Sequence, residues 1–253
     1  MTARTAFALV MLPLLLAACG NGDERALQGW VEAEIVYVSP DEQGRVETLK
    51  VREGDKVAPG DLLFTLDDDL QKSDLVVKQA AVTTAGQAFT RAQDLLRAAA
   101  GTQKALDDAE AALRQAKANL GWSETRLARR RGLSPAGGTI QEVYYRPGET
   151  VPPGRPVIAL LPPANLKLRF FARQAMLPRI KIGDTVAVSC DGCVKDIVAK
   201  VSFIARNAEY TPPVIYSREE RAKLVYLIEA RPAEPEQLRV GQPVTVTLPE
   251  PSK

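Results

Sequence analysis

Few residues of this chain could do chemistry, because the sequence contains no histidine. Histidine is the usual general base of enzymes and a very common metal ligand, so its absence excludes Ser-His-Asp triads and histidine-based zinc sites. Among the side chains that remain, the three cysteines at positions 19, 190 and 193 have the most informative surroundings. We therefore expect a protein that is not an enzyme, with no catalytic residue, no metal and no cofactor.

Cys190 and Cys193 form a CxxC motif around Asp191-Gly192, which favours a turn. A zinc site would need two further ligands, and a thioredoxin-like motif should open a helix in a βαβ unit, whereas this one lies between two β-prone segments. In an oxidising compartment the pair is predicted to form a local disulfide across the turn. Reduced structural cysteines are the alternative.

Cys19 follows an apolar run, Ala6 to Ala18, that is too short for a comfortable transmembrane helix and is typical of a signal peptide. The ending Leu16-Ala17-Ala18-Cys19 and the polar residues after it resemble the lipobox of bacterial lipoproteins, whose cysteine is acylated and becomes the mature N-terminus. We expect a lipoprotein signal peptide at residues 1–18, lipidation of Cys19 and a linker at residues 19–28. An ordinary signal peptide is the alternative.

Two runs of like charge could be mistaken for a metal or nucleic-acid site, Asp67-Asp68-Asp69 and Arg129-Arg130-Arg131. Carboxylates at the start of one helix and guanidinium groups at the end of another oppose the helix dipoles. We interpret the two runs as a complementary charged hinge at the base of a helical hairpin. The formal net charge of +2 gives no reason to expect nucleic acid.

The elements around these residues are organised by a repeat. GRVETLKVREGDKVAPGDLLFTLD at residues 44–67 matches GTIQEVYYRPGETVPPGRPVIALL at residues 138–161 without a gap, at an offset of 94. Each copy holds short β-prone stretches punctuated by glycines and is too small to bury a core alone. The two copies are predicted to face each other in one small β-sandwich with quasi-two-fold symmetry.

The segment between the two copies predicts a helical hairpin. It has no proline and is rich in strong helix formers. Heptad positions 75, 82, 89 and 96 pair antiparallel with positions 127, 120, 113 and 106, which places the turn at Gly101 and Thr102 at the N-cap of the second helix. Each arm of about 30 residues would be about 45 Å long.

After Asn165 the pattern changes to β. Strand-length apolar or alternating segments follow one another, separated by turn residues, with a short helix expected from Gln174 to Ile180. They predict a small β-barrel of about 85 residues, and Trp30 is expected on an entering strand that packs against it. The strand segments are residues 166–172, 185–189, 197–204, 224–230 and 244–248.

The two half motifs, V-S-P-x3-G-R-V…E-G-D-x-V-x-x-G-x-x-L and S-P-x-x-G-T-I…P-G-x-x-V-x-x-G, resemble those of HlyD-type membrane fusion proteins, or periplasmic adaptors. The stretch from Glu209 to Pro232 resembles the subgroup associated with ABC-type exporters. The first copy has one residue more between Pro40 and Gly44 than lies between Pro135 and Gly138, and we interpret it as a difference in a turn.

The resemblance implies an elongated, mainly β protein in which a split lipoyl/biotinyl-like β-sandwich carries an inserted antiparallel coiled-coil hairpin and a small β-barrel follows. It also implies an inner-membrane ABC-type transporter and a TolC-type outer-membrane channel as partners, six copies in a ring, and a periplasmic location with the lipid on the inner membrane. The expected domains are residues 29–67 (entering strand and first half), 68–132 (hairpin), 133–163 (second half) and 164–250 (barrel).

Many adaptors of this family carry Arg-x3-Leu-x6-Ser at the hairpin tip, and this chain reads Arg91-x3-Leu95-x6-Thr102. Arg91 and Leu95 share a helix face, and Thr102 lies across the turn. The resemblance implies that these residues contact the outer-membrane channel. The alternatives are a solvated charge at Arg91, a flank of the coiled-coil seam at Leu95 and only a helix cap at Thr102.

Two other functions remain to be weighed. A lipoyl or biotinyl carrier would present a lysine on a tight turn between the two halves, where this chain has a long hairpin. A structural coiled-coil lipoprotein that scaffolds the envelope without a role in transport fits the same elements. Loss of an export phenotype on deletion separates an adaptor from such a scaffold.

Overall fold

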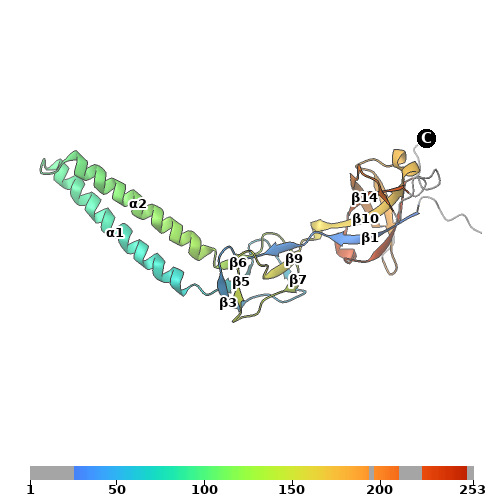
Figure 1. Cartoon of the computed structure of the whole chain (residues 1–253), viewed down its shortest axis with the longest axis horizontal. Coiled ribbons are helices and arrows are strands. Elements are labelled where there is room, and N and C mark those ends of the chain that lie inside the picture. Colours follow the sequence, from blue (N-terminus) through green and yellow to red (C-terminus); the bar gives the residue numbers. More distant parts are fainter. Residues whose placement is uncertain (1–25, 194–196, 211–223, 250–253) are drawn as a thin grey trace, which may run out of the picture. The chain divides into compact units, whose positions relative to one another are not determined.

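The computed structural model describes residues 26–193, 197–210 and 224–249. The predicted signal peptide, Cys19 and much of the stretch from Glu209 to Pro232 lie outside these residues. The chain divides into two compact units, one made of residues 34–163 and the other of residue 33 and those before it together with residues from 164 onward. The first unit holds the sandwich and the hairpin, and the second holds the barrel (Figure 1).

Short strands of the first unit form two four-stranded sheets, ordered β2-β9-β7-β4 and β6-β5-β3-β8. Each sheet has a central pair of strands from one copy of the repeat. One of its edge strands, β4 or β8, comes from the other copy, and the second, β2 or β6, comes from the residues just before that other copy. Neither copy can therefore form a sheet of its own. The strands are β2 (Val36–Val38), β3 (Gly44–Leu49), β4 (Lys56–Val57), β5 (Leu62–Leu66), β6 (Arg131–Leu133), β7 (Gly138–Val143), β8 (Thr150–Val151) and β9 (Ile158–Leu161).

The quasi-two-fold symmetry predicted from the repeat extends to single hydrogen bonds. The amide of Val46 donates to the carbonyl of Glu149 at 2.8 Å, and the amide of Ile140 donates to that of Asp55 at 2.9 Å. The two donors, Val46 and Ile140, are 94 positions apart, and so are the two acceptors, Asp55 and Glu149. The two bonds are therefore symmetry equivalents. The β3–β5 and β7–β9 pairings have the same relation, including a register shift at equivalent positions.

The extra residue predicted between Pro40 and Gly44 is not an insertion. The amide of Gly60 donates to the carbonyl of Ser134 at 2.8 Å, and its symmetry mate Gly154 donates to that of Pro40 at 2.9 Å. Pro40 is thus equivalent to Ser134, and the two loops have equal length. Pro40 and Pro135 are therefore not equivalent, because the constant offset of 94 pairs Pro40 with Ser134.

The sandwich core is made by the same positions in both copies. Val46, Phe64 and Leu66 from the first copy are matched by Ile140, Ile158 and Leu160 from the second, and every one of them is at most 1% exposed. These residues lie on the central strands β3, β5, β7 and β9. The core therefore forms only when the two copies meet, which is what the sequence predicted.

Two turns in the sandwich use the same local chemistry. In Arg52–Asp55 and Arg146–Glu149 the carboxylate of the last residue accepts a hydrogen bond from the amide of the first, at 2.7 and 2.9 Å. Gly54 and Gly148, at φ of +90° and +95°, supply the left-handed conformation that a type II turn requires at its third residue. The glycines of the repeat are therefore fixed by backbone geometry.

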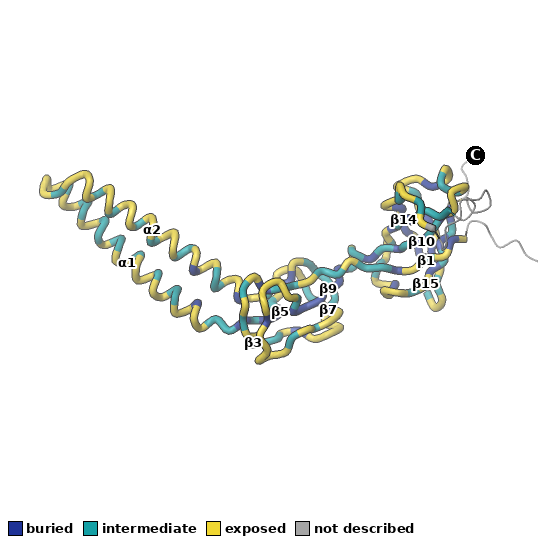
Figure 2. Tube along the Cα trace, in the orientation of Figure 1, coloured by how far each residue is buried: buried dark blue, intermediate teal, exposed yellow. Residues whose placement is uncertain are grey.

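The hairpin consists of α1 (Asp69–Arg97) and α2 (Gln103–Ala128). It is inserted between β5 and β6, which are antiparallel neighbours. Both helices are therefore joined to the same end of the sandwich (Figure 1). Figure 2 shows both helices alternating between intermediate and exposed residues. The predicted heptad positions are the half-buried ones, including Leu106, Leu113, Leu120 and Leu127 on α2.

The second unit is a closed barrel. The strands follow one another in the order β10-β1-β15-β11-β12-β14, and pairing of β14 with β10 closes the barrel. The short strand β13 also pairs with β14. Every strand segment predicted after Asn165 is present, and Gln174–Arg179 forms a short 3₁₀ helix where a short helix was expected. The strands are β1 (Ala26–Ala33), β10 (Leu166–Arg173), β11 (Thr185–Ser189), β12 (Ile197–Ile204), β13 (Glu209–Tyr210), β14 (Leu224–Pro232) and β15 (Pro243–Thr247).

The first strand corrects one predicted boundary and one predicted role. β1 starts at Ala26, inside the predicted linker, and it pairs with β10 and β15. It is therefore a wall of the barrel and not a strand that merely packs on it. Gly29 permits this closure, because a Cβ there would lie 2.4 Å from the carbonyl oxygen of Arg169. Trp30 packs on Phe171 of β10, with ring centroids 5.8 Å apart.

Candidate functional site

The hairpin tip is closed by a Schellman motif that uses alanine in place of glycine. The amide of Ala100 donates to the carbonyl of Leu95 at 2.9 Å, and that of Ala99 donates to Leu96 at 3.0 Å, which is the paired pattern of this motif. Ala99 has a φ of +53°. The left-handed residue of the turn is thus Ala99, two positions before Gly101, where the heptad pairing placed the turn.

Gly101 is required for space. A Cβ on Gly101 would lie 3.0 Å from the amide nitrogen of Leu96 and 3.1 Å from the Cβ of Leu95. The glycine lets the chain pass close to the end of α1. The sequence located this turn correctly, between the end of α1 at Arg97 and the N-cap of α2 at Thr102.

The three predicted tip residues come from both sides of this turn. Thr102 is the N-cap of α2, as predicted, and its Oγ1 accepts from the amide of Ala105 at 3.2 Å. Leu95 is 51% exposed, and Arg91 is also exposed. Among the described residues Arg91 has no ion-pair partner, so its guanidinium group is available to a molecule outside the chain.

The hairpin also carries apolar side chains that its own seam does not use. Leu70 and Val77 of α1 are 82% and 62% exposed, and Trp122 of α2 is 67% exposed. Residues 70, 77, 84 and 91 follow a heptad spacing, so Arg91 shares one helix face with Leu70 and Val77. Val77 and Trp122 each lie two positions after a seam leucine, which puts them on the same side of an antiparallel pair. That side of the hairpin is an unpartnered apolar surface.

The base of the hairpin is held by the loop after β2. Glu42 accepts from Nε and Nη2 of Arg126 at 3.0 and 3.2 Å, and from Nη2 of Arg130 at 3.1 Å. Arg130 also donates to the carbonyl of Gln43 at 2.8 Å and, with the amide oxygen of Gln71 turned toward it, to Gln71. We call these contacts the Glu42 clamp. It fixes the last turn of α2 to the sandwich.

The Glu42 clamp replaces the charged hinge predicted from the sequence. Asp67 pairs with Arg45 at 2.7 Å, Asp68 with Lys72 at 2.6 Å, and Arg129 with Asp41 at 3.4 Å. The aspartate and arginine runs thus find separate partners and do not pair with each other. Sequence reasoning missed Asp41 and Glu42, because the loop that holds them is distant in sequence from both helices.

The electrostatics of the clamp follow from its geometry. The hydrogen bond from Arg126, helped by the charges of Arg126, Arg130 and Arg129, lowers the pKa of Glu42 below its ordinary value. The hydrogen bond from Arg45 lowers the pKa of Asp67 in the same way. Both carboxylates are therefore ionised at neutral pH, and their charges hold the arginines at the base of the hairpin.

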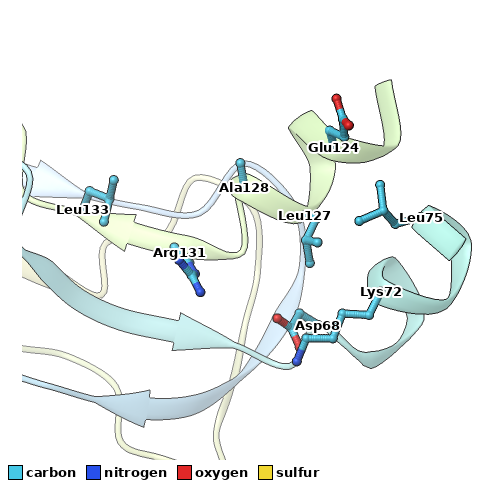
Figure 3. A pocket seen from close by; sticks show the side chains of 8 residues that line it. All are labelled: Asp68, Lys72, Leu75, Glu124, Leu127, Ala128, Arg131 and Leu133. Atoms are coloured by element: carbon cyan, nitrogen blue, oxygen red, sulfur yellow. The ribbon is translucent and has the colours of Figure 1, made fainter. Parts of the chain in front are cut away.

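Beside the clamp lies a groove of about 470 Å³ between the two helices and β6 (Figure 3). Leu75 and Leu127, a predicted seam pair, both line it, with Ala128 and Leu133. Asp68, Lys72, Glu124 and Arg131 form its rim. The groove marks the end of the seam, where the helices separate to join β5 and β6.

Cys190 and Cys193 lie at the turn between β11 and β12. The structure joins them in a disulfide with Cα atoms 5.3 Å apart, and the amide of Cys193 donates to the carbonyl of Cys190 at 3.2 Å. Gly192, at φ of +77°, completes the turn. The motif thus lies between two strands, with no helix after it in the described residues, as the sequence analysis expected of a turn clamp.

Comparison with known proteins places this architecture. No family model matches the sequence. A UPF0194 membrane protein of Acidithiobacillus ferridurans is 27% identical, with 88% of this chain and 86% of the relative covered. The membrane fusion protein Spr0693 of Streptococcus pneumoniae R6 superposes with a TM-score of 0.70 at 20% identity, covering 90% of this chain and 99% of that one. The fold is that of a membrane fusion protein.

A second solved structure with the membrane fusion fold is a MacA–MexA chimeric protein containing the α-hairpin domain of Pseudomonas aeruginosa MexA. It has a TM-score of 0.71 at 21% identity, and 88% of this chain and 79% of the chimeric chain are covered. The resemblance predicted from the two half motifs is thus confirmed at the level of the fold. Among the described residues of this membrane fusion fold, no helix is long and apolar enough to cross a membrane.

Proposed function

We propose that this chain is a periplasmic adaptor that is not an enzyme and that links an inner-membrane ABC-type exporter to a TolC-type outer-membrane channel. The observation that carries the proposal is the interleaved sandwich with an α-hairpin inserted between β5 and β6. In a lipoyl or biotinyl carrier this position would hold a short turn with a lysine. Here it holds two helices of 29 and 26 residues, which suit a reach toward a distant partner.

The proposal includes assembly of several copies, six in the ring that the family resemblance implies. A single two-helix hairpin encloses no conduit, whereas hairpins side by side can form one. The apolar side of the hairpin, with Val77 and Trp122, supports this, because exposed aliphatic and aromatic side chains on one face favour association. Val77→Asp should reduce the assembled fraction in analytical ultracentrifugation, whereas Thr83→Asp, on the other side of α1, should leave it unchanged.

The contact with the outer-membrane channel is proposed at the tip, through Arg91, Leu95 and Thr102. Arg91→Asp and Leu95→Asp should each abolish cysteine cross-linking to the channel and reduce export, because both side chains are exposed and Arg91 has no ion-pair partner among the described residues. Retained docking after both charge substitutions would show that this surface is not the contact. Arg114→Asp serves as the control, because Arg114 lies on the opposite arm and its one ion pair in the described part of the chain is with Glu110.

Thr102 needs a separate design, since it already caps α2. Thr102→Ala removes the cap together with the hydroxyl, whereas Thr102→Ser keeps both. A docking role for the hydroxyl predicts that the serine variant docks normally. Thr102→Asp retains a good N-cap and adds a charge, so loss of docking in that variant alone would separate recognition from helix stability.

The proposed location is the periplasm, with a lipid on Cys19 and with the inner membrane as the membrane that holds it. Cys19→Ser should give an unprocessed or soluble chain, and globomycin should block maturation; normal processing of the variant would exclude lipidation. The adaptor is separated from a structural envelope lipoprotein by deleting the gene, measuring sensitivity to a panel of toxic compounds, and testing whether an ABC-type permease is recovered with the chain.

A further inference from the structure

One end of the barrel is defined by the first residue of β1. Ala26 lies opposite Thr247 of β15, and Thr247 lies opposite Ala187 of β11, so these residues form one row across three adjacent strands. Neighbouring strands are about 4.8 Å apart, which puts Ala26 about 10 Å from Ala187. β1 and β11 run in the same direction, because both pair antiparallel with β15. Ile182, five residues before Ala187, therefore lies past this row, beyond the start of the strands. We call this the Ala26 end of the barrel; the opposite end holds Ala33.

A rigid turn presents Ile182 at the Ala26 end. The carboxylate of Asp184 accepts from the amide of Lys181 at 2.7 Å, and the amide of Gly183 donates to the carbonyl of Val201 at 2.8 Å. Gly183 has a φ of +97°. The side chain of Ile182 is therefore held outward, and it is 68% exposed. An aliphatic side chain exposed at a fixed turn contributes no burial free energy to the stability of the fold.

The equivalent turns of the sandwich avoid this exposure. Their second residues are Glu53 and Pro147, which suit water and a type II turn. Ile182 instead shares a groove of about 590 Å³ with Phe203, which is 47% exposed, and Ile204. The Ala26 end thus combines a fixed aliphatic tip with an exposed aromatic ring.

Basic side chains surround this apolar tip. Arg173 ends β10 in the position opposite Ala26, and Arg179, Lys181 and Arg206 follow at the same end, all of them exposed. Among the described residues the acidic ones at this end are Glu209 and Asp184, and the carboxylate of Asp184 accepts the hydrogen bond that closes the turn. Aliphatic and aromatic side chains ringed by lysine and arginine are the composition of surfaces that insert into the interface of an anionic bilayer.

We infer that the Ala26 end of the barrel rests on an anionic lipid surface, with Ile182 and Phe203 entering the headgroup region. The inference builds on the proposed lipid on Cys19, which lies seven residues before Ala26. Seven residues span at most about 25 Å, so an anchored chain keeps the barrel end within that distance of the bilayer. The acyl chains then hold the protein on the membrane, and the Ala26 end orients it.

The test uses the full-length acylated protein with a photoreactive benzoyl-phenylalanine in place of Ile182. Val240 is the matched control. It occupies the same position of a similar turn, follows a basic residue and is 50% exposed. The amide of the next residue, Gly241, donates to the carbonyl of Val31, so this turn lies toward the opposite end of the barrel. Protein in vesicles of phosphatidylethanolamine and phosphatidylglycerol is first separated by flotation and then irradiated.

We expect lipid adducts from position 182 in several-fold excess over position 240. Vesicles of phosphatidylcholine alone, or the charge reversals Lys181→Glu and Arg206→Glu, should reduce that excess. Flotation without an excess at position 182 would overturn the inference and leave the adaptor function standing, and cross-linking of position 182 to a protein in cells would assign this end to protein docking instead. Failure to float would remove the anchor and the inference together.

Discussion

The sandwich and the hairpin bury their apolar residues to very different extents. The sandwich holds Phe64, Ile140 and Leu160 at 1% exposure or less, whereas on α1 and α2 the only buried residues are polar, Gln71 and Ser123. The sandwich is thus a finished core, stabilised by its own residues. The hairpin leaves its seam half-buried and a second apolar side open, which is what an element that associates with other molecules requires.

The sandwich and the hairpin also differ in whether their structure depends on distant or on neighbouring residues. The sandwich depends on pairing between the two copies, because the central strands of each sheet come from one copy and pair with an edge strand of the other. The hairpin depends on local helix propensity and on neighbouring turns. Perturbing one copy should therefore destroy the sandwich, whereas perturbing the hairpin should have local consequences.

Deleting residues 136–161 tests the interleaving and should have the largest effect. The deletion removes the central strands of one sheet and an edge strand of the other, so the sandwich should lose cooperative unfolding altogether. Replacing residues 70–130 by a short Gly-Ser linker should leave sandwich and barrel folded but without export activity. A folded sandwich in the first variant, by calorimetry and near-UV circular dichroism, would contradict the interleaved topology.

Glycine-to-alanine substitutions should act in opposite directions in the two regions. A Cβ on Gly132 of β6 would lie 2.2 Å from the ring of Phe64, so Gly132→Ala should lower the free energy of unfolding by about 3 kcal/mol or more. Gly121 of α2 has no atom within 4 Å of an added Cβ. Gly121→Ala should stabilise the hairpin by about 0.5–1 kcal/mol. Chemical denaturation of both variants measures the two effects.

Removing the carboxylate of Glu42 should loosen the join between hairpin and sandwich. Glu42→Gln weakens three hydrogen bonds and leaves the buried Arg130 without its counter-charge, at a cost of about 1–2 kcal/mol after screening by solvent. Glu110→Gln breaks an exposed pair within α2 and should cost less than about 0.5 kcal/mol. Equal effects of the two substitutions would show that the clamp contributes no more than a surface ion pair.

The pH dependence of the clamp has a definite sign. The folded-state pKa of Glu42 lies below the ordinary value of 4.5, so its contribution is present above that pH. It is lost as the pH falls through the lowered folded pKa, where the carboxylate is protonated. The stability difference between wild type and Glu42→Gln should therefore shrink on acidification below pH 4.5 and stay constant near neutrality. A difference that grew on acidification would rule this out.

The smallest effect is expected at the hairpin tip. Ala99 occupies a left-handed conformation that costs a non-glycine residue about 1 kcal/mol, so Ala99→Gly should raise the stability of the tip by up to that amount. Amide hydrogen exchange of residues 94–106 reports it directly. Slower exchange in Ala99→Gly and unchanged exchange at the hairpin base is the expected pattern; faster exchange at the tip would contradict the Schellman assignment.

The sequence by itself determined the parts that local pattern controls. The constant offset of 94 identified the two sandwich copies, the heptads gave the hairpin register, and Thr102 was recognised as a helix cap from its chemistry and position. The barrel strands followed from short apolar segments between turns. Each of these features depends on residues close in sequence or on a repeat that can be read directly.

Only the tertiary structure decided the features that join distant segments. It assigned β1 to the barrel wall, made Pro40 equivalent to Ser134, and brought Glu42 to the arginines at the end of α2. It also showed that Ala99 is the left-handed residue of the tip. Closure of the barrel and ion pairing between distant residues depend on which segments lie next to each other in the folded chain. A local sequence pattern is compatible with several such arrangements.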